Sequence, residues 1–427
     1  MKPLKILLSL KILLSAVLFL FSIPAFADFD IIVEVNLPPT AALAAFQATL
    51  NGTILDVLAD PDNSNGSLVH VSGPGVPNFP PGIVGRVHTN VLATLPPIRH
   101  ASCWVRAPQT ANASWYTTQP SFKLINSPGA RAYATGRNVA VAIIDSLVDY
   151  SHPAVAGNLT IGNDLIAQRG QGQGTINLGD SSAGYLDDSS AGYLDQATIT
   201  YLNDSSAGYL DDSSAGYLDG KPSAWSHATA VASIIVGIAP DTMIMPVRAF
   251  NDTGTSDTVT LYKAITWAVD NGAQVINMSF STLTQTKLME KAITYALGHG
   301  VTLVAAAGND NMPALPSPAL LPGVISTTAT DLHDVKASFS NYGNGVVMDA
   351  PGVNIIAAVP GNLYGCMSGT SFSAPIIAGT AADVLSEGVT SVTNRITSGG
   401  VNIDPNNPAY SGQLGVRVDV LKSVRPN

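Results

Sequence analysis

Residues 368–375 read Ser-Gly-Thr-Ser-Phe-Ser-Ala-Pro and run directly into an apolar segment at residues 376–385. The spacing of the apolar residues predicts a buried helix, and Pro375 is tolerated only close to its first turn. Ser371 is therefore expected at the helix N-terminus, where unpaired amides and the helix dipole favour negative charge. This position suits either an N-cap serine or the nucleophile of an acyl-transfer site.

Upstream of this helix, from about residue 114, apolar runs of strand length alternate with helical segments. We expect strands at 139–144, 242–247, 275–280 and 301–306, and helices at 229–236, 260–271 and 286–299. Such alternation is typical of βαβ units. It predicts an α/β fold with three layers, in which a mostly parallel, doubly wound sheet carries helices on both faces.

Two segments precede this region. Residues 1–27 combine lysines, an apolar run at 12–21 and the sequence Ala25-Phe26-Ala27, which together predict a cleaved signal peptide rather than a membrane anchor. Residues 28–112 read as a small α+β unit with extended segments at 30–35, 53–58, 68–71 and 87–95 and a helix at 40–50. This unit suits a propeptide or an accessory binding module, and residues 113–427 are expected to form the main domain.

The composition is that of a well-buried globular protein with an acidic surface. The 427 residues are 46% hydrophobic and only 12% charged. Removal of residues 1–27 takes away three lysines, so the 20 basic residues fall to 17 against 30 acidic ones. This excess of negative charge argues against nucleic acid as a partner and against a membrane surface once the signal peptide is cleaved.

An octapeptide repeat forms an insertion at residues 172–219. Four copies of Asp-Ser-Ser-Ala-Gly-Tyr-Leu-Asp occupy 180–187, 188–195, 204–211 and 212–219, and diverged copies fill 172–179 and 196–203. Glycine within a period of eight fits no helix, so we expect short Tyr-Leu strands separated by turns. We interpret the block as a duplicated acidic surface insertion; cation binding or a role at the substrate rim are the alternatives.

Four polar residues stand at the ends of the expected elements, where open α/β sheets place their sites. Asp145 ends the first strand of the sheet, His227 begins a helix of small residues, Asn309 follows the strand at 301–306, and Ser371 begins the core helix. A serine hydrolase combines the same groups: a carboxylate, an imidazole, an amide and a hydroxyl.

Seven segments that carry or flank these residues resemble, in chain order, the motifs of the subtilisin-like serine peptidases (subtilases). They are IIDS at 143–146, SHAT at 226–229, VINMS at 275–279, AAGN at 306–309, FSNYG at 339–343, APG at 350–352 and GTSFSAP at 369–375. The resemblance extends over about residues 121–424, so a subtilisin-like fold is expected for the main domain.

The resemblance also implies a role for each site residue. Ser371 would attack the scissile carbonyl, His227 would transfer the proton and Asp145 would orient the imidazole. Asn309 and the backbone N–H of Ser371 would form the oxyanion hole. Substrate would be bound by the cleft strand and the oxyanion segment, at Ser279, Phe280, Ser281, Ala306, Ala307 and Gly308.

Three positions depart from the family pattern. Leu147 and Ala228, beside the aspartate and the histidine, and Ser281 in the cleft strand stand where the family usually has glycine. Leu147 requires the turn after the aspartate to avoid positive φ. A second histidine, His152, is too close in sequence to the aspartate to belong to a separate element, so we expect it to be structural. For Cys366 we expect a small buried side chain rather than a nucleophile.

Together with the resemblance, these observations predict a secreted serine endopeptidase of the extracellular space or cell envelope, and the resemblance implies that it is made as a self-processing zymogen. Residues 28–112 would act as its intramolecular inhibitor, and a monomer would cleave protein or peptide substrates without a required cofactor. Calcium is suggested as a structural ion by the resemblance alone. The alternatives are a catalytically silent subtilase fold used for binding, and a surface protein whose repeats bind cations. A disulfide between Cys103 and Cys366 is the one bridge that the sequence allows.

Overall fold

The computed structural model describes residues 29–74, 77–80, 84–95, 99–106, 114–166, 175–176, 224–282 and 284–425. The chain forms two compact units, Met1–Asn90 and Val91–Asn427. The predicted signal peptide and nearly all of the octapeptide insertion lie outside the described residues. Within the described ranges, none of the helices has the length and hydropathy needed to cross a membrane.

The first unit is a four-stranded antiparallel sheet with one helix, as expected for a small α+β unit. Its strands follow the order β2-β3-β1-β4. The elements are β1 (Phe29–Val35), α2 (Pro39–Thr49), β2 (Thr53–Asp60), β3 (Asn63–Gly73) and β4 (Val84–Thr89). Alternate residues of β1, among them Val33 and Val35, pack with Phe46 of α2 in a small core.

The second unit is built on a ten-stranded sheet with the order β18-β19-β15-β14-β13-β12-β7-β10-β8-β9. The neighbours from β19 to β8 are all parallel, and only β18 and β9 pair in antiparallel fashion at the edges. The strands are β7 (Ala140–Asp145), β8 (Gly162–Asp164), β9 (Thr175–Ile176), β10 (Met243–Arg248), β12 (Val275–Met278), β13 (Thr302–Ala306), β14 (Val324–Thr330), β15 (Met348–Pro351), β18 (Val401–Asn402) and β19 (Val416–Arg417). The predicted mostly parallel α/β sheet is confirmed.

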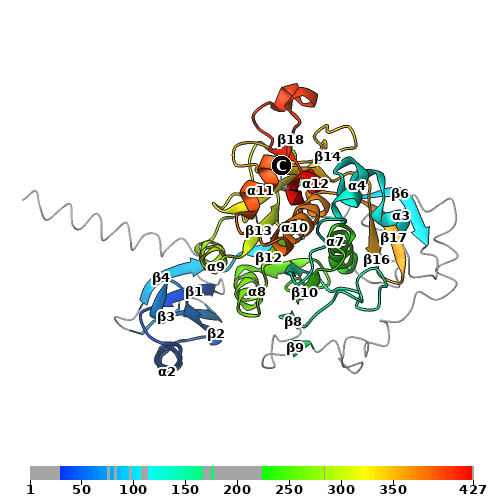
Figure 1. The fold of residues 1–427 in the computed structure, drawn as a ribbon. Helices are drawn as coiled ribbons and strands as arrows, with labels where there is room; N and C mark the ends of the chain where they lie inside the picture. Colours follow the sequence, from blue (N-terminus) through cyan, green and yellow to red (C-terminus); the bar gives the residue numbers. More distant parts are fainter. Residues whose placement is uncertain are drawn as a thin grey trace, which may run out of the picture. The chain divides into compact units, whose positions relative to one another are not determined.

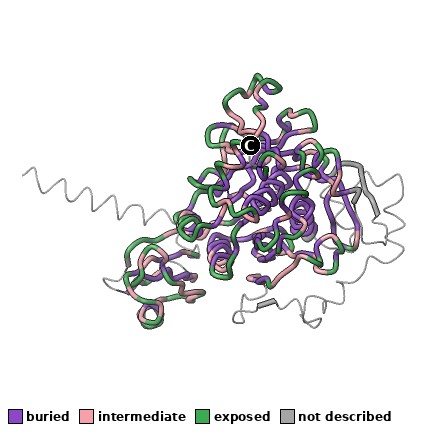
Figure 2. The backbone as a smooth tube through the Cα atoms, viewed as in Figure 1, coloured by how far each residue is buried: buried purple, intermediate pink, exposed green. Residues whose placement is uncertain are grey.

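Helices pack on both faces of this sheet (Figure 1). On one face, α8 (Thr258–Asp270) and α9 (Lys287–Gly298) contact each other; α8 also contacts β7 and β10, and α9 contacts β13. On the other face, α7 (Ala224–Ile238) and α10 (Thr370–Ser386) contact each other. There α7 contacts β7, and α10 contacts β7 and the strands β12 to β15. The shorter helices are α3 (Ser114–Thr117), α4 (Pro120–Leu124), α5 (Ser127–Ala130), α11 (Val392–Gly399), α12 (Val420–Val424) and the 3-10 turns η3 (Asp404–Asn406) and η4 (Pro408–Tyr410). Buried positions concentrate in the central strands and in α7 and α10 (Figure 2).

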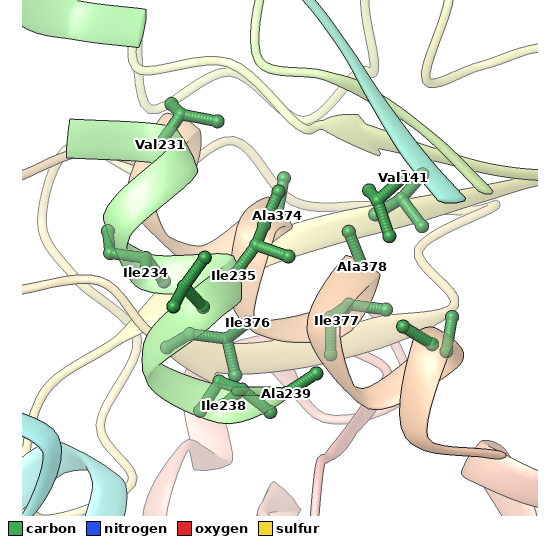
Figure 3. Packing of buried hydrophobic residues seen from close by; sticks show 14 of the residues in the cluster. Val141, Val231, Ile234, Ile235, Ile238, Ala239, Ala374, Ile376, Ile377 and Ala378 are labelled. Carbon is green, nitrogen blue, oxygen red and sulfur yellow. The ribbon is translucent and has the colours of Figure 1, made fainter. Parts of the chain in front are cut away.

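Aliphatic side chains of α7 and α10 form the main core together with the sheet (Figure 3). Ile235 and Ile238 of α7 lie beside Ile376 and Ile377 of α10, and all four are fully buried. Every residue of α10 from 370 to 384 is buried, which explains why its sequence is apolar on all sides rather than amphipathic.

Two smaller antiparallel sheets contain the first strands of the second unit. β5 (Leu92–Thr94) pairs with β11 (Thr255–Asp257), and β6 (Arg99–Arg106) pairs with β17 (Leu363–Ser368), which also pairs with β16 (Ile355–Val359). The sequence pattern grouped residues 91–106 with the N-terminal unit. Their partners lie far along the chain, so this pairing leaves no local signal in the sequence.

Cys366 on β17 is disulfide-bonded. The sequence contains one other cysteine, Cys103, which falls within β6. Cys366 is buried, as expected, and because its sulfur is in a disulfide it offers no free thiol that could act as a nucleophile.

Candidate active site

Asp145 lies at the carboxyl end of β7, as predicted, and is fully buried. Its Oδ1 accepts hydrogen bonds from the backbone N–H of Ser146 at 2.7 Å and from the Ser146 hydroxyl at 3.2 Å. The same hydroxyl oxygen accepts a bond from the N–H of Ala228 at 3.3 Å. Because Ala228 belongs to α7, these contacts connect the carboxylate to the beginning of that helix.

His227 lies in the first turn of α7 and is buried against Asp145. Its Nδ1 is 2.9 Å from each oxygen of the Asp145 carboxylate. A carboxylate only accepts hydrogen bonds, so in the neutral imidazole Nδ1 carries the hydrogen and Nε2 keeps a lone pair. Nε2 is among the buried polar atoms of the described residues that have no hydrogen-bond partner. The pair thus presents a correctly oriented base with an open acceptor.

Ser371 is the second residue of α10, so the predicted position at a helix N-terminus is confirmed. Its Oγ donates to the carbonyl of Ser279 at 3.0 Å. The N–H groups in the first turn of a helix have no acceptor within that helix and remain available as donors. The next residue, Phe372, places its ring centroid 5.7 Å from that of His227. The nucleophile candidate and the base candidate therefore lie on adjoining elements.

Pro375 explains why Ser371 needs a partner outside α10. In an α-helix the carbonyl of residue 371 would accept from the N–H of residue 375, which proline lacks. The hydroxyl of Ser279 supplies the missing bond at 2.9 Å. Asn277 Nδ2 donates to that hydroxyl at 2.9 Å and holds it in place. The end of β12 therefore fixes the beginning of α10.

Asn309 follows β13 and is oriented by Thr370. Its Oδ1 accepts from the N–H of Thr370 at 2.9 Å and from the Thr370 hydroxyl at 3.0 Å. Since the amide oxygen is engaged, the NH2 group points away from Thr370 and stays available as a donor. The hydroxyl of Thr370 also accepts from the N–H of Gly308 at 3.1 Å. Sequence reasoning missed this role of Thr370, although the residue directly precedes Ser371.

The loop after β13 is supported from behind by Asn341 and Lys336. Asn341 Oδ1 accepts from the N–H groups of Asp310 and Met312 at 3.0 and 2.9 Å. Lys336 Nζ donates to Asn311 Oδ1 at 2.9 Å and to two backbone carbonyls at 3.0 and 2.7 Å. Burial lowers the pKa of Lys336. These bonds restrain the segment that carries Asn309.

The three predicted substrate-binding residues of the cleft strand, Ser279, Phe280 and Ser281, differ in which of their groups could reach a substrate. Ser279 holds Ser371, as described above. Phe280 is fully buried, with its ring centroid 5.2 Å from that of Phe250, so its side chain belongs to the core. Ser281 forms an antiparallel bridge with Thr94. Any contact of this strand with substrate would therefore run through its backbone groups and Ser281.

The other three predicted substrate-binding residues end the neighbouring strand β13. Ala306 and Ala307 are buried, and Gly308 has a φ of 95°. A Cβ atom at Gly308 would lie 2.4 Å from Asn341 Nδ2. Glycine is required here both by the backbone angle and by the space. Contact of these residues with substrate stays a prediction.

His152, the rival base, uses both ring nitrogens in the structure. Nε2 lies 3.0 Å from the carbonyl of Leu363 and Nδ1 accepts from the N–H of Ala154 at 3.1 Å. Burial lowers the pKa of His152, which keeps the ring neutral. This geometry fits the structural role expected from the sequence.

The departures from the family pattern are accommodated locally. Leu147 is not among the described residues with positive φ, in keeping with the turn expected after Asp145. Ala228 is fully buried in the core formed by α7 and α10. Among the described residues, no group of three or more His, Cys, Asp or Glu side chains is arranged to hold a metal ion.

A model described as the subtilase family matches residues 136–396, more than half of the chain. The chain belongs to the subtilase family. This subtilase is 33% identical over 255 residues to a thermophilic serine proteinase of Bacillus sp. (strain AK1), with 60% of this chain and 54% of that protein covered. It is 30% identical over 269 residues to thermitase of Thermoactinomyces vulgaris, with 62% and 81% covered.

A solved structure described as the prenylagaramide maturation protease shares the fold. It aligns with a TM-score of 0.51 and 26% identity, covering 70% of this subtilase and 96% of that chain. The chain spans about half the length of the Bacillus proteinase and about four fifths of thermitase. The family recognised from the sequence and the subtilisin-like fold are thus confirmed.

Proposed function

We propose that this subtilase is a secreted serine endopeptidase that uses Ser371, His227 and Asp145. The observation that carries the proposal is the buried pair of Asp145 and His227, whose Nε2 has no partner among the described residues. The pair lies beside a serine at the beginning of a helix, where developing negative charge is stabilised. A relative that is named a thermophilic serine proteinase supports the same activity.

The first half of the reaction forms an acyl-enzyme. Rotation about χ1 moves the Ser371 hydroxyl from the carbonyl of Ser279 toward Nε2 of His227, which takes its proton as Oγ attacks the peptide carbonyl. The Asn309 amide and the N–H of Ser371 donate to the resulting oxyanion. The carbon–nitrogen bond then breaks, and His227 gives its proton to the departing amine. Asp145 stabilises the imidazolium in both transfers.

The second half returns the free enzyme. Water enters, His227 takes one of its protons, and the hydroxide attacks the ester of Ser371. The oxyanion uses the same two donors. Collapse of this intermediate breaks the ester bond, and His227 returns the proton to Ser371 Oγ. Water is the second substrate, and no cofactor takes part in this scheme.

Export and zymogen processing belong to the same proposal. A disulfide at Cys366 suits an oxidising compartment, and the segment 1–27 has the composition of a signal peptide. Residues 28–112 would be an N-terminal propeptide removed by self-cleavage, and the mature enzyme would be a monomer acting on proteins or peptides. Calcium would be a structural ion only, with ligands unassigned.

Active-site labelling tests the proposal. A fluorophosphonate probe is expected to label the wild-type protein and to leave Ser371→Ala and His227→Ala unlabelled, in parallel with hydrolysis of labelled casein. Ser386→Ala, at the opposite end of α10, serves as the matched control and should keep both signals. Folded wild-type protein, tested both oxidised and reduced, that shows neither Ser371-dependent label nor hydrolysis would instead support the catalytically silent binding fold.

A further inference from the structure

Lys336 is a buried lysine whose ammonium group contacts the loop that carries Asn309. The residue is only 6% exposed. Its Nζ donates to Oδ1 of Asn311 at 2.9 Å and to the backbone carbonyls of Ala337 and Ser340 at 3.0 and 2.7 Å. An ammonium group has three donors and no acceptor, so these bonds use its full hydrogen-bonding capacity.

Two tyrosine rings complete the surroundings of this ammonium group. Nζ lies 5.1 Å from the ring centroid of Tyr342 and 4.7 Å from that of Tyr410. The two rings pack edge to face, with their centroids 4.8 Å apart. An aromatic ring attracts a cation within about 6 Å of its centroid, most strongly where water is excluded. Three neutral oxygens and two aromatic rings therefore form a cage around the buried charge of Lys336.

The cage joins segments that lie far apart in the sequence. Asn311 belongs to the loop after β13, two residues beyond Asn309, whereas Tyr410 ends η4. The backbone of Lys336 is also bound from the segment around η4, since its N–H donates to Oδ1 of Asn407 at 2.7 Å. Lys336 is thus the point at which residues 407–410 meet the loop of the oxyanion donor.

The backbone of this loop needs such support at Asn311. Asn311 has a φ of 54°, in the left-handed region that few residues other than glycine occupy. Its N–H donates to the carbonyl of Phe339 at 2.7 Å, and its side chain accepts from Lys336. A conformation of this kind persists only where surrounding contacts hold it. Loss of the ammonium group would therefore let the loop, including Asn309, relax.

We propose that Lys336 is a positioning residue for Asn309, whose caged ammonium group holds the oxyanion donor in the geometry that catalysis requires. The proposal rests on the endopeptidase function above, in which Lys336 touches no reacting atom. An oxyanion donor is effective only within about 2.7–3.1 Å of the developing charge, so a small displacement of Asn309 lowers kcat. The remaining contacts with substrate are unaffected, so KM should change little.

Neutralising the charge is the first test. Lys336→Met keeps a long apolar side chain but leaves the three oxygens of the cage without their donor. We expect kcat on a peptide substrate to fall by about 10- to 100-fold, with KM changed by less than about twofold. Lys287→Met, at a lysine of α9 whose side chain is 59% exposed, is the matched control and should keep both constants.

A double-mutant cycle tests whether Lys336 acts through Asn309. Once Asn309→Ala has removed the donor, its position no longer matters. We therefore expect Lys336→Met to lower kcat by less than about threefold in the Asn309→Ala background, against the much larger loss in the wild type. A residue that only stabilises the fold would cause the same loss of kcat in both backgrounds.

Chemical rescue tests whether the charge itself is needed. Lys336→Ala removes three methylene groups and the ammonium, which together correspond to propylammonium. We expect propylammonium chloride to raise kcat of Lys336→Ala by about fivefold or more in a saturable manner, because the cage attracts a cation. The neutral analogue 1-propanol, at the same concentration, should have no such effect, and neither compound should activate the wild type.

A milder variant covers the case in which the substitutions of Lys336 do not fold. Tyr410→Leu removes one ring of the cage and leaves the three oxygens bonded. We expect kcat to fall by about two- to tenfold with KM unchanged. Thermal melting of each variant verifies the fold.

The outcomes separate the positioning role from the proposed function. Equal losses of kcat in both backgrounds, a raised KM with unchanged kcat, or equal rescue by 1-propanol would overturn the role of Lys336 and leave the endopeptidase intact. If the wild type shows neither Ser371-dependent labelling nor hydrolysis, the endopeptidase function itself fails, and the positioning role with it.

Discussion

At the scale of single residues, the site depends on donors whose direction is set by their neighbours. Thr370 engages the oxygen of the Asn309 amide through both its N–H and its hydroxyl, which leaves the NH2 group as the donor. Ser146 orients an acceptor: its N–H donates to Oδ1 of Asp145, whose two oxygens both face Nδ1 of His227. Such preorganised donors lose no energy to reorientation during the reaction, which is why they contribute strongly to catalysis.

Replacing Asn309 with alanine should therefore affect the chemical step rather than binding. We expect kcat to fall by about 10²–10³-fold, the range seen when one oxyanion donor is removed, with little change in KM. Steady-state kinetics on a peptide substrate measures the split, and thermal melting checks that the fold is intact. A raised KM with an unchanged kcat would place Asn309 outside the oxyanion hole.

Gly308→Ala tests the backbone that carries Asn309. The backbone φ of 95° at this position is unfavourable for alanine, and the new Cβ atom would lie 2.4 Å from Asn341 Nδ2. We expect a loss of about 1–3 kcal/mol in the free energy of unfolding, together with a reduced kcat. Gly272→Ala is the control, because its φ is 86° and a Cβ there meets nothing within 4 Å. Equal losses for the two variants would show that strain alone, and not the clash, accounts for the effect.

At the scale of elements, α10 combines the proposed nucleophile Ser371 with close packing against α7. Its first turn is fixed by Ser279, and its middle approaches α7 at Gly379. A Cβ atom at Gly379 would lie 2.8 Å from Cβ of Ile238 and 3.1 Å from the carbonyl of Ile235. A shift of α10 to relieve such a contact would also displace Ser371, since one rigid helix carries both residues.

Gly379→Ala should consequently destabilise the protein although alanine is the better helix former. Overpacking of this kind lowers the free energy of unfolding by about 1–3 kcal/mol. Replacing glycine with alanine inside a helix raises it by only about 0.5–1 kcal/mol. Chemical denaturation of the full chain gives the difference. Gly298→Ala, in α9 with open space around the new atom, should be neutral or stabilising. Stabilisation by Gly379→Ala would contradict the close packing of α7 and α10.

At the scale of the whole molecule, buried carboxyl groups connect stability to pH. Burial raises the pKa of Asp349 to about 7 and raises that of Asp383 well above its ordinary value. Both carboxyl oxygens of Asp383 are buried without hydrogen-bond partners among the described residues. A folded state that holds these protons more tightly than the unfolded state loses stability as pH rises above about 4.

Asp383→Asn should remove the part of the pH-dependent loss of stability that comes from Asp383. We expect the variant to match the wild type near pH 4 and to melt at progressively higher temperature than the wild type as pH rises toward 8, because no charge then has to be buried. Thermal melts at several pH values measure the difference. Asp310→Asn, at an exposed position, is the control and should show no such trend. A constant offset between Asp383→Asn and the wild type would argue against titration of Asp383.

Much of the fold and site followed from local sequence patterns. Alternating strand and helix periods predicted the parallel sheet because each element shows its buried face in its own sequence. Asp145, His227, Asn309 and Ser371 were found because parallel strands end, and helices begin, at one edge of such a sheet. Element ends alone left alternative roles open for each residue, and the resemblance of their motifs to those of the subtilases selected them as the predicted site.

The tertiary structure alone decided which groups touch. The exchange of hydrogen bonds between Ser279 and Ser371, the control of Asn309 by Thr370, and the pairing of β5 with β11 join segments far apart in the chain. The same holds for the pairing of β17, the strand of Cys366, with β6, which the sequence pattern grouped with another unit. These contacts depend on loop paths and strand register rather than on periodicity, so no local pattern encodes them.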